Sequence, residues 1–282
     1  MDILYREFFA SDEVGIRMNY AEYPTERIHD FRTHNHIVCE MLFLLDGDIS
    51  YKIEGRSYEL RRYDLVFVRP GKNHYLTFDS REVPYRRFNV LVSPKCFPKS
   101  LFDELPDDAD VISFEGNDRV KSIFEELENY SVALDEEAKA MLFPALMCEV
   151  FCQFAIAARD PERRLPSSSN RTLDSALRYI EENLCEIDDI EQICNELFIT
   201  KSHLHHLFSE NIRLSPKKYI NQKKLLLARR KIRRGANPTE VFRECGFTDY
   251  TTFYRNYKSY FGYPPSLEGE GIVQITMPPM EL

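Results

Sequence analysis

Three residues in the first quarter of the chain have the types and spacing to bind a metal ion or a polar ligand. His34, His36 and Glu40 form the pattern H-x-H-x3-E, and two histidines separated by one residue point the same way on an extended segment. His74 follows the turn sequence RPGKN, and a hairpin would bring it alongside them. Imidazoles with a carboxylate suit a divalent metal, and the same groups suit hydrogen bonding to a small molecule. A polar cluster with a purely structural role is the third interpretation.

The rest of the sequence offers no catalytic or membrane motif. No serine or cysteine lies in a recognisable nucleophile elbow, and the seven cysteines are odd in number and form no C-x-x-C pair, as in reduced cytoplasmic proteins. No uninterrupted apolar run approaches the roughly 20 residues of a membrane-spanning helix. The first residues lack the basic and apolar regions of a secretory signal. We expect a cytoplasmic protein that is not an enzyme, has no cofactor and does not bind membranes.

Two kinds of element must position these residues. From about 20 to 93 the chain alternates with period 2 between D-G and E-G turns, which predicts a small antiparallel β-barrel or sandwich. From about 118 to 159 the period becomes helical. The stretch Ala138–Arg159 is apolar around much of its circumference, so we expect it to form a homodimer interface near Leu142, Leu146, Val150 and Phe154.

The distribution of charge separates the two halves of the chain. Residues 1–169 carry 21 Lys+Arg against 31 Asp+Glu, a net of −10, whereas residues 170–267 carry 16 against 12, a net of +4. Residues 213–234 hold ten basic side chains and no acidic one. Such a segment in an acidic protein indicates a module that binds a polyanion, the alternative being a solvated helix face.

Beyond the exposed sequence RDPERRLPSSSNRT, the chain has the pattern of two helix-turn-helix units joined by a long helix. In each unit the second helix must bury one face and present the other to a DNA major groove. Leu204, Leu207 and Phe208 define the first inward face, and Phe253 and Tyr257 define the second. The side chains left outward are Ser202, His205 and His206 in the first unit, and Tyr250, Thr251, Tyr254 and Arg255 in the second.

Residues from about 173 to 265 resemble the DNA-binding domain of the AraC/XylS family of bacterial transcription regulators. The resemblance rests mainly on the motif GFTDYTTFYRNYKSYFGYPP, near the end of the chain. The resemblance implies that the outward residues contact DNA bases. To these contacts we add contacts between basic residues and the phosphate backbone of the DNA. Phe198 stands where the family usually has glycine. The expected DNA-binding residues are Lys201, Ser202, His205, His206, Lys224, Arg230, Tyr250, Thr251, Tyr254 and Arg255.

The first half resembles a cupin, the β-barrel that also forms the sensor domain of this family. In cupin enzymes, residues at the positions of His34, His36, Glu40 and His74 hold a divalent metal. Here we assign the four to effector binding, with a sugar or small acid as the ligand, and expect no stoichiometric metal. Further residues expected at the pocket are Arg32, Tyr51, Arg69, Arg87 and Asn89.

The predicted fold class is α+β with two domains. The expected organisation is a cupin-like effector-sensing domain with a helical dimerisation appendage at 1–160, a linker at 161–172, an all-α double helix-turn-helix domain at 173–267 and an unassigned tail at 268–282. The predicted function is a transcription regulator that binds operator DNA as a homodimer, responds to a small effector and acts with RNA polymerase as a further partner. The alternative is a cupin metalloenzyme fused to a helical domain that serves assembly only.

Overall fold

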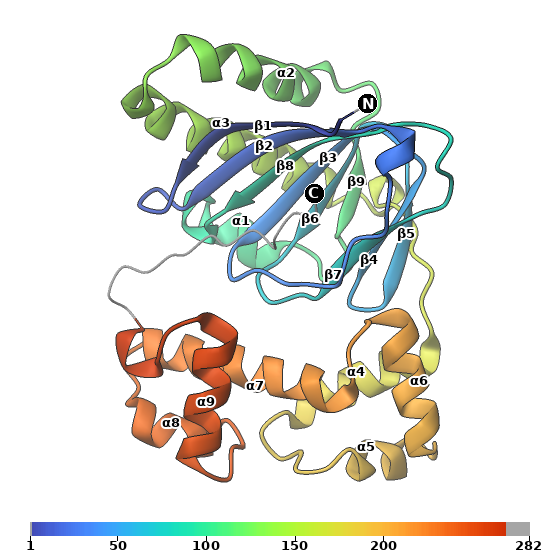
Figure 1. Cartoon of the computed structure of the whole chain (residues 1–282), viewed down its shortest axis with the longest axis vertical. Helices are drawn as coiled ribbons and strands as arrows, with labels where there is room; N and C mark the ends of the chain where they lie inside the picture. Colours follow the sequence, from blue (N-terminus) through green and yellow to red (C-terminus); the bar gives the residue numbers. More distant parts are fainter. Residues whose placement is uncertain (1, 269–282) are drawn as a thin grey trace. The chain divides into compact units, whose positions relative to one another are not determined.

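A computed structural model describes residues 2–268 of the chain. The chain divides into two compact units, with the boundary between Ser168 and Ser169. The first unit combines two β-sheets with helices, and the second is entirely helical over its described residues (Figure 1). These two classes of structure are the ones that the change of hydrophobic period predicts.

The larger sheet of the first unit has six strands and is antiparallel throughout. Its strands, in spatial order, are β1 (Leu4–Ser11), β2 (Ile16–Tyr23), β8 (Tyr85–Val92), β3 (Cys39–Asp46), β6 (Asp64–Val68) and β9 (Val111–Ser113). The central strand β3 reads CEMLFLLD, because a strand covered on both faces has no polar side to alternate with. Met41 and Phe43 enter the core beneath the helices, whereas Leu42 and Leu44 enter the core between the sheets.

The smaller sheet has the order β5 (Arg56–Leu60), β4 (Ile49–Ile53) and β7 (His74–Phe78). Its Tyr51 and Tyr58 pack against Leu42 and Val66 of the larger sheet, so both sheets share one interior. The hydrogen bonds of the described strands do not close these sheets into a continuous barrel. The sequence could not settle this point, because period-2 alternation is the same in a barrel and in two facing sheets.

Helices cover the outer face of the larger sheet (Figure 1). They are α1 (Lys99–Glu104), α2 (Asp118–Ala133) and α3 (Glu136–Ala157). The unit also contains the short 3-10 turns η1 (Thr25–Arg27), η2 (Pro94–Cys96) and η3 (Pro161–Arg163). Among the described helices, α3 has the length and apolar composition to cross a membrane. In this chain it is a core helix, because Phe143, Met147 and Phe151 are fully buried against the sheet.

The facing of α3 contradicts the predicted dimer contacts. Leu146, Val150 and Phe154 belong to the core of their own unit, and Leu142 is partly buried against that core. The apolar side chains that α3 exposes are different ones, among them Met141 and Ile156. The buried face of a helix that is apolar around its circumference cannot be predicted from sequence, because such a helix has no hydrophobic period.

Part of the segment expected as a linker is paired with the first unit. Leu165 N donates to Val111 O at 3.0 Å, and Ser57 and Ser168 exchange two backbone hydrogen bonds of 2.8 and 3.0 Å. The segment therefore adds to the exposed edges of β9 and β5. The next helix begins only three residues after Ser168, at Arg171.

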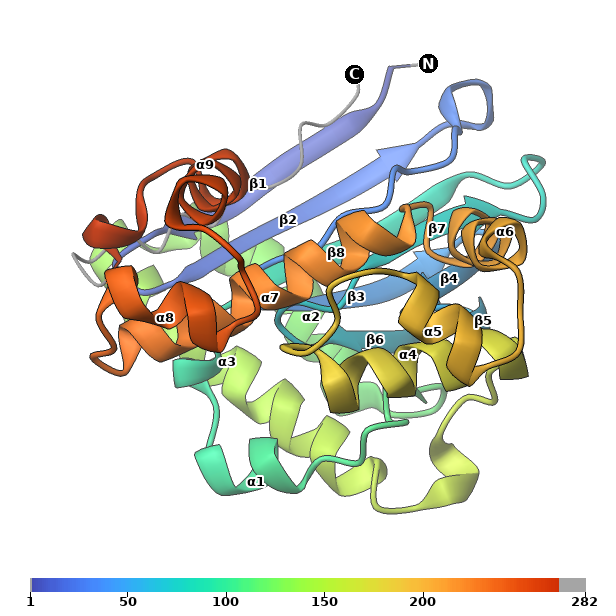
Figure 2. The same ribbon diagram turned by 90° about the horizontal axis from the view of Figure 1, so that it is seen from below.

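The second unit contains two helix pairs connected by α7. Its elements are α4 (Arg171–Asn183), α5 (Glu191–Glu196), α6 (Lys201–Asn211), α7 (Pro216–Arg233), α8 (Pro238–Glu244), α9 (Tyr250–Phe261) and the 3-10 turn η4 (Pro265–Leu267). Figure 2 shows α7 running from the α5–α6 pair to the α8–α9 pair. Each pair has its own core: Leu204 and Phe208 lie in the first, and Phe253 and Tyr257 in the second.

Candidate functional site

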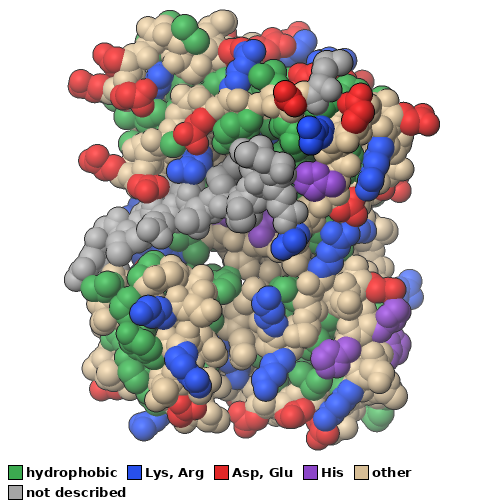
Figure 3. Space-filling model, in the orientation of Figure 1, with side chains coloured by type: hydrophobic (Ala, Val, Ile, Leu, Met, Phe, Trp, Pro, Cys, Tyr) green, Lys and Arg blue, Asp and Glu red, His purple; other side chains and the backbone are tan. Residues whose placement is uncertain are grey.

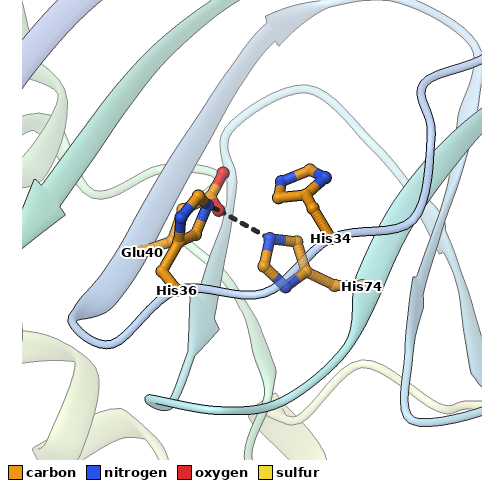
Figure 4. A group of neighbouring side chains, drawn as sticks. All are labelled: His34, His36, Glu40 and His74. Atoms are coloured by element: carbon orange, nitrogen blue, oxygen red, sulfur yellow. Dashed lines mark hydrogen bonds and ion pairs between the residues drawn. The ribbon is translucent and has the colours of Figure 1, made fainter. Parts of the chain in front are cut away.

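The four residues of the predicted effector site converge in the first unit (Figure 4). The potential ligand atoms of His34, His36, Glu40 and His74 all lie within 4.8 Å of one another. Glu40 stands on β3 and His74 opens β7, whereas the two other histidines lie in the segment before β3. That segment is attached to β7 because His34 and His74 exchange two backbone hydrogen bonds, of 3.0 and 2.9 Å. An isolated bridge therefore replaces the strand expected for His34 and His36.

Backbone carbonyls set the orientation of two of the imidazoles. His34 Nδ1 lies 2.8 Å from Arg32 O, and His74 Nδ1 lies 2.9 Å from Lys72 O. Because a carbonyl only accepts, both Nδ1 atoms carry protons. Burial, with His74 nearby, lowers the pKa of His34 to about 3, so its Nε2 is left as an acceptor.

Glu40 is the buried anion at the centre of the cluster. Its Oε2 lies 2.7 Å from His74 Nε2 and 3.0 Å from His36 Nε2. Its Oε1 accepts from Asn89 Nδ2 at 2.9 Å and from the Tyr51 hydroxyl at 3.5 Å. Burial alone raises the pKa of the Glu40 carboxyl, but His74 and His36 outweigh burial and hold that pKa well below its usual range. The carboxylate is therefore ionised and surrounded by donors.

The donor set also fits a divalent cation. Three imidazoles and one carboxylate are the ligands that iron, zinc or manganese take in proteins, and the two carbonyl contacts are the outer-shell hydrogen bonds that orient such histidines. Both ring nitrogens of His74 face acceptors. His34, His36, Glu40 and His74 would hold such a cation, which would supply Lewis-acid chemistry there.

The structure places some of the further expected pocket residues near the cluster and others away from it. Tyr51 and Asn89 contact Glu40, and the side chain of Arg87 lies on the same interior face of β8 as Asn89. Arg69 contradicts the expectation, because its Nη2 donates to Leu105 O and Pro106 O at 2.7 Å and so fastens the chain before β9. For Arg32 the contact to the cluster is made by its backbone carbonyl.

Sequence reasoning missed Asn19, a further polar residue of this interior. Asn19 is buried on β2 and accepts a 2.9 Å hydrogen bond from Arg87 Nη1. The signal was available, because Asn19 shares the period-2 face of Ala21 and Tyr23, both in the core between the sheets.

In the second unit, α6 and α9 have the facing that was expected of recognition helices. Leu204 and Phe208 are fully buried, whereas Ser202, His205 and His206 are exposed on the same helix. On α9, Thr251 and Arg255 are exposed and Tyr250 and Tyr254 are partly exposed. Lys201 opens α6 at the surface, where its Nζ lies 2.5 Å from Glu191. On the face drawn in Figure 3, Lys and Arg side chains lie across the second unit, with histidines towards one end.

The position of Lys224 contradicts the phosphate contact expected of it. Its side chain is only 4% exposed, and Nζ donates to Ile187 O at 2.7 Å and to Gly246 O at 2.8 Å. Ile187 precedes α5, and Gly246 lies between α8 and α9, so this lysine joins the two helix pairs. Gly246 has φ +74°, and a Cβ there would overlap Cys185 O, so the junction admits only glycine.

Two further residues of this unit have roles that the motif did not reveal. Phe198, in the turn between α5 and α6, adopts φ +53° and is 96% exposed. Glu268 is the first residue of the expected tail, and its Oε2 accepts from Arg229, Tyr257 and Tyr263 at 3.0, 2.6 and 2.8 Å. Glu268 thus fastens the described end of the chain to α7 and α9. The rest of the tail, 269–282, lies outside the described residues.

A buried polar cluster in a two-sheet domain, and two helices with exposed faces at helix-turn-helix positions in a helical domain, are the features that a ligand-responsive DNA-binding protein requires. Comparison with known proteins agrees. The family model described as an AraC-like ligand binding domain matches residues 17–141, and a helix-turn-helix domain model matches residues 193–267. The two models together span most of the chain, which belongs to the AraC/XylS family of transcription regulators.

Individual relatives are distant, and two of them match almost the whole chain. The chain is 22% identical over 272 residues to the HTH-type transcriptional activator RhaS of Escherichia coli O1:K1, covering 92% of this chain and 93% of RhaS. Among solved structures, ToxT from Vibrio cholerae O395 matches 93% of this chain and 99% of its own, with 14% identity and a TM-score of 0.39. A cupin superfamily protein from Desulfitobacterium hafniense matches 33% of this chain and 78% of its own, with 11% identity and a TM-score of 0.28.

The family membership decides between the two predicted functions. The helix-turn-helix model covers the region that the metalloenzyme alternative treats as an assembly domain. The chain is an AraC-type transcription regulator with a ligand-binding domain followed by a DNA-binding domain.

Proposed function

We propose that this regulator binds its operator through α6 and α9 together and that a small effector held at His34, His36, Glu40 and His74 controls the binding. The observation that carries the proposal is the presence of two exposed recognition faces in one helical unit, fixed to each other through Lys224. A fixed pair of helices reads two successive stretches of major groove as one site.

Several finer features belong to the same proposal. We assign no catalytic step to the chain, and we place it in the cytoplasm as a homodimer. RNA polymerase is the partner through which it would act on transcription, with activation as the direction because the relatives named RhaS are activators. Binding of the effector changes the population of arrangements that are competent for the operator.

The test begins with selection of bound fragments from the source genome by the purified full chain. In gel-shift titrations on a selected site, Arg255→Ala should cost about 1–3 kcal/mol and relax the preference at one base pair, because an exposed arginine on a recognition helix reads guanine in the major groove. Arg243→Ala is the matched control, since Arg243 is also exposed but lies on α8. An equal loss of DNA affinity in both variants, or no loss in either, would show that Arg255 does not read a base.

A further inference from the structure

The interior between the sheets contains a buried cation, Arg87, that has no carboxylate within ion-pair distance among the described residues. Arg87 on β8 is only 4% exposed. Its Nη1 donates to the neutral Asn19 Oδ1 at 2.9 Å, and within residues 2–268 Arg87 takes part in no ion pair. A buried guanidinium without an anion is expensive, and buried charges in proteins are normally paired. The position of Arg87 therefore favours an anion from outside the chain in direct contact with the guanidinium.

The two amides next to Arg87 have polar atoms that the protein leaves unused. Asn19 and Asn89 stand directly opposite each other on β2 and β8. Asn19 Nδ2 and Asn89 Oδ1 are both buried and have no hydrogen-bond partner in the described part of the chain. Most buried polar atoms are paired, so these two mark a place where a partner belongs. Together with Arg87 they offer two donors and one acceptor.

This place is continuous with the effector cluster. Asn89 Nδ2 donates to Glu40 Oε1 at 2.9 Å, so the amide whose oxygen is unused also contacts the cluster through its nitrogen. Asn19, Arg87 and Asn89 all lie on the strand face that lines the core between the sheets, as Ala21 and Tyr85 of the same faces do. Of the four residues of the cluster, His34 is the one that is partly exposed. The phenol groups of Tyr51 and Tyr85 act on Arg87, as does the Glu40 carboxylate from beyond ion-pair distance. Glu40 itself is in direct contact with His36 and His74.

We propose that the effector is a small hydroxycarboxylic acid whose carboxylate binds Arg87 and Asn19 Nδ2 and whose hydroxyl donates to Asn89 Oδ1. A carboxylate accepts from both donors and neutralises the guanidinium, and a hydroxyl supplies the proton that Asn89 Oδ1 lacks. A neutral sugar would leave Arg87 without an anion. General electrostatics cannot attract an acid here, because residues 1–169 have a net charge of −10, so Arg87 is the specific determinant. The inference rests on the proposed effector role of this domain.

The first experiment compares matched acids and neutral sugars on the full-length wild-type protein. D-Galacturonate is tested against D-galactose, and D-gluconate against D-glucitol, by titration calorimetry and by thermal unfolding. Because a charge-assisted contact to the carboxylate is lost in the neutral partner, the acid of at least one pair should bind about tenfold to hundredfold more tightly. Equal affinity within both pairs, or no binding of either acid at millimolar concentration, overturns the proposal.

The second experiment assigns the binding to Arg87. Arg87→Gln should lower the affinity for the acid about tenfold or more while the affinity for the neutral partner stays the same. Arg86→Gln is the matched control, because Arg86 is the next residue of β8, points to the opposite face and pairs with Asp46 at 2.6 Å. Asn19→Ala should weaken acid binding in the same direction, and it gives the answer if Arg87→Gln fails to fold. Retention of wild-type affinity in the folded variants contradicts the assignment.

The outcomes distinguish this inference from the proposed function. If the acids bind through Arg87 but leave DNA affinity unchanged, the ligand class stands and effector control of the operator fails. If the neutral sugar binds as well as the acid and alters DNA affinity, effector control stands and the ligand class is wrong.

Discussion

Single residues of one charge run behave differently in this chain. The run 213–234 contains both Lys224, which is buried against two carbonyl oxygens, and Arg230, which is exposed. Composition predicted the polyanion-binding surface but not which members of the run form it. The position on α7 decides, because Lys224 lies on the face that carries the buried Leu225 and Ala228.

This difference predicts opposite behaviour for two variants. Arg230→Ala should reduce the steepness of the salt dependence of DNA binding by about one unit, as loss of one phosphate contact does. Lys224→Met keeps the aliphatic stem but deprives Ile187 O and Gly246 O of their donor, so it should lower the free energy of unfolding by about 1–3 kcal/mol and leave the salt slope unchanged. Urea unfolding and DNA titrations at several salt concentrations check both. A reduced salt slope in Lys224→Met would show that Lys224 does contact a phosphate.

A second prediction at the scale of residues concerns metal in the histidine cluster. We expect the purified protein to hold far less than one transition metal ion per chain, because His36, His74, Asn89 and Tyr51 already surround both oxygens of Glu40. Elemental analysis of protein purified without chelator measures this directly. The contrary result is one metal ion per chain that is lost in His74→Ala and kept in His203→Ala, the exposed histidine being the control.

At the scale of elements, the sequence predicted the buried face of those helices that have one apolar side and one polar side. The amphipathic helices α6 and α9 have the buried and exposed faces that their spacing indicates. The helix α3 does not, because its apolar residues surround it and leave no period to read. The attachment of His34 to β7 was equally hidden, since a two-residue bridge between distant segments depends on the tertiary fold and leaves no local pattern. The close approach of Gly246 to the Cys185 carbonyl could not be predicted from the sequence for the same reason.

The exposed face of α3 carries the prediction about self-association. Met141, Ala145, Cys148, Cys152 and Ile156 recur at intervals of three or four and form one stripe on the helix. Met141 is 75% exposed and Ile156 59% exposed, which leaves an apolar surface that a second copy of the chain would cover.

We therefore expect Met141→Glu combined with Ile156→Glu to convert a dimer into a monomer in sedimentation at micromolar concentration. Val132→Glu is the control, because Val132 is 87% exposed on α2, outside the stripe, and the variant should stay dimeric. Val150→Ala should instead lower stability by about 1–3 kcal/mol without changing the oligomeric state, since Val150 is fully buried in the core. A wild-type protein that is monomeric with and without DNA contradicts the interface.

At the scale of the whole molecule, the effector domain must act on the DNA-binding domain through the chain that joins them. That chain is fastened at the edge of the first unit, because Ser57 and Ser168 exchange two backbone hydrogen bonds. The second unit begins at the next residue. An effector that changes the sheet carrying β5 therefore has a short covalent route to α4, and coupling between such sites is typically worth about 1–3 kcal/mol, or roughly 5- to 150-fold in affinity.

The last prediction separates effector binding from its transmission. Ser168→Pro removes the amide that donates to Ser57 O, and the proline ring prevents the bridge from forming. This variant should bind the acid identified above and the operator with near wild-type affinities, but the ratio of operator affinities with and without the acid should fall towards one. Ser57→Ala is the matched control and should keep the full ratio, because the bridge uses only its backbone. Glu40→Gln should lose acid binding and the response together, since it removes the anion that orients His36, His74 and the Asn89 amide. An undiminished ratio in Ser168→Pro would mean that the bridge plays no part in the coupling.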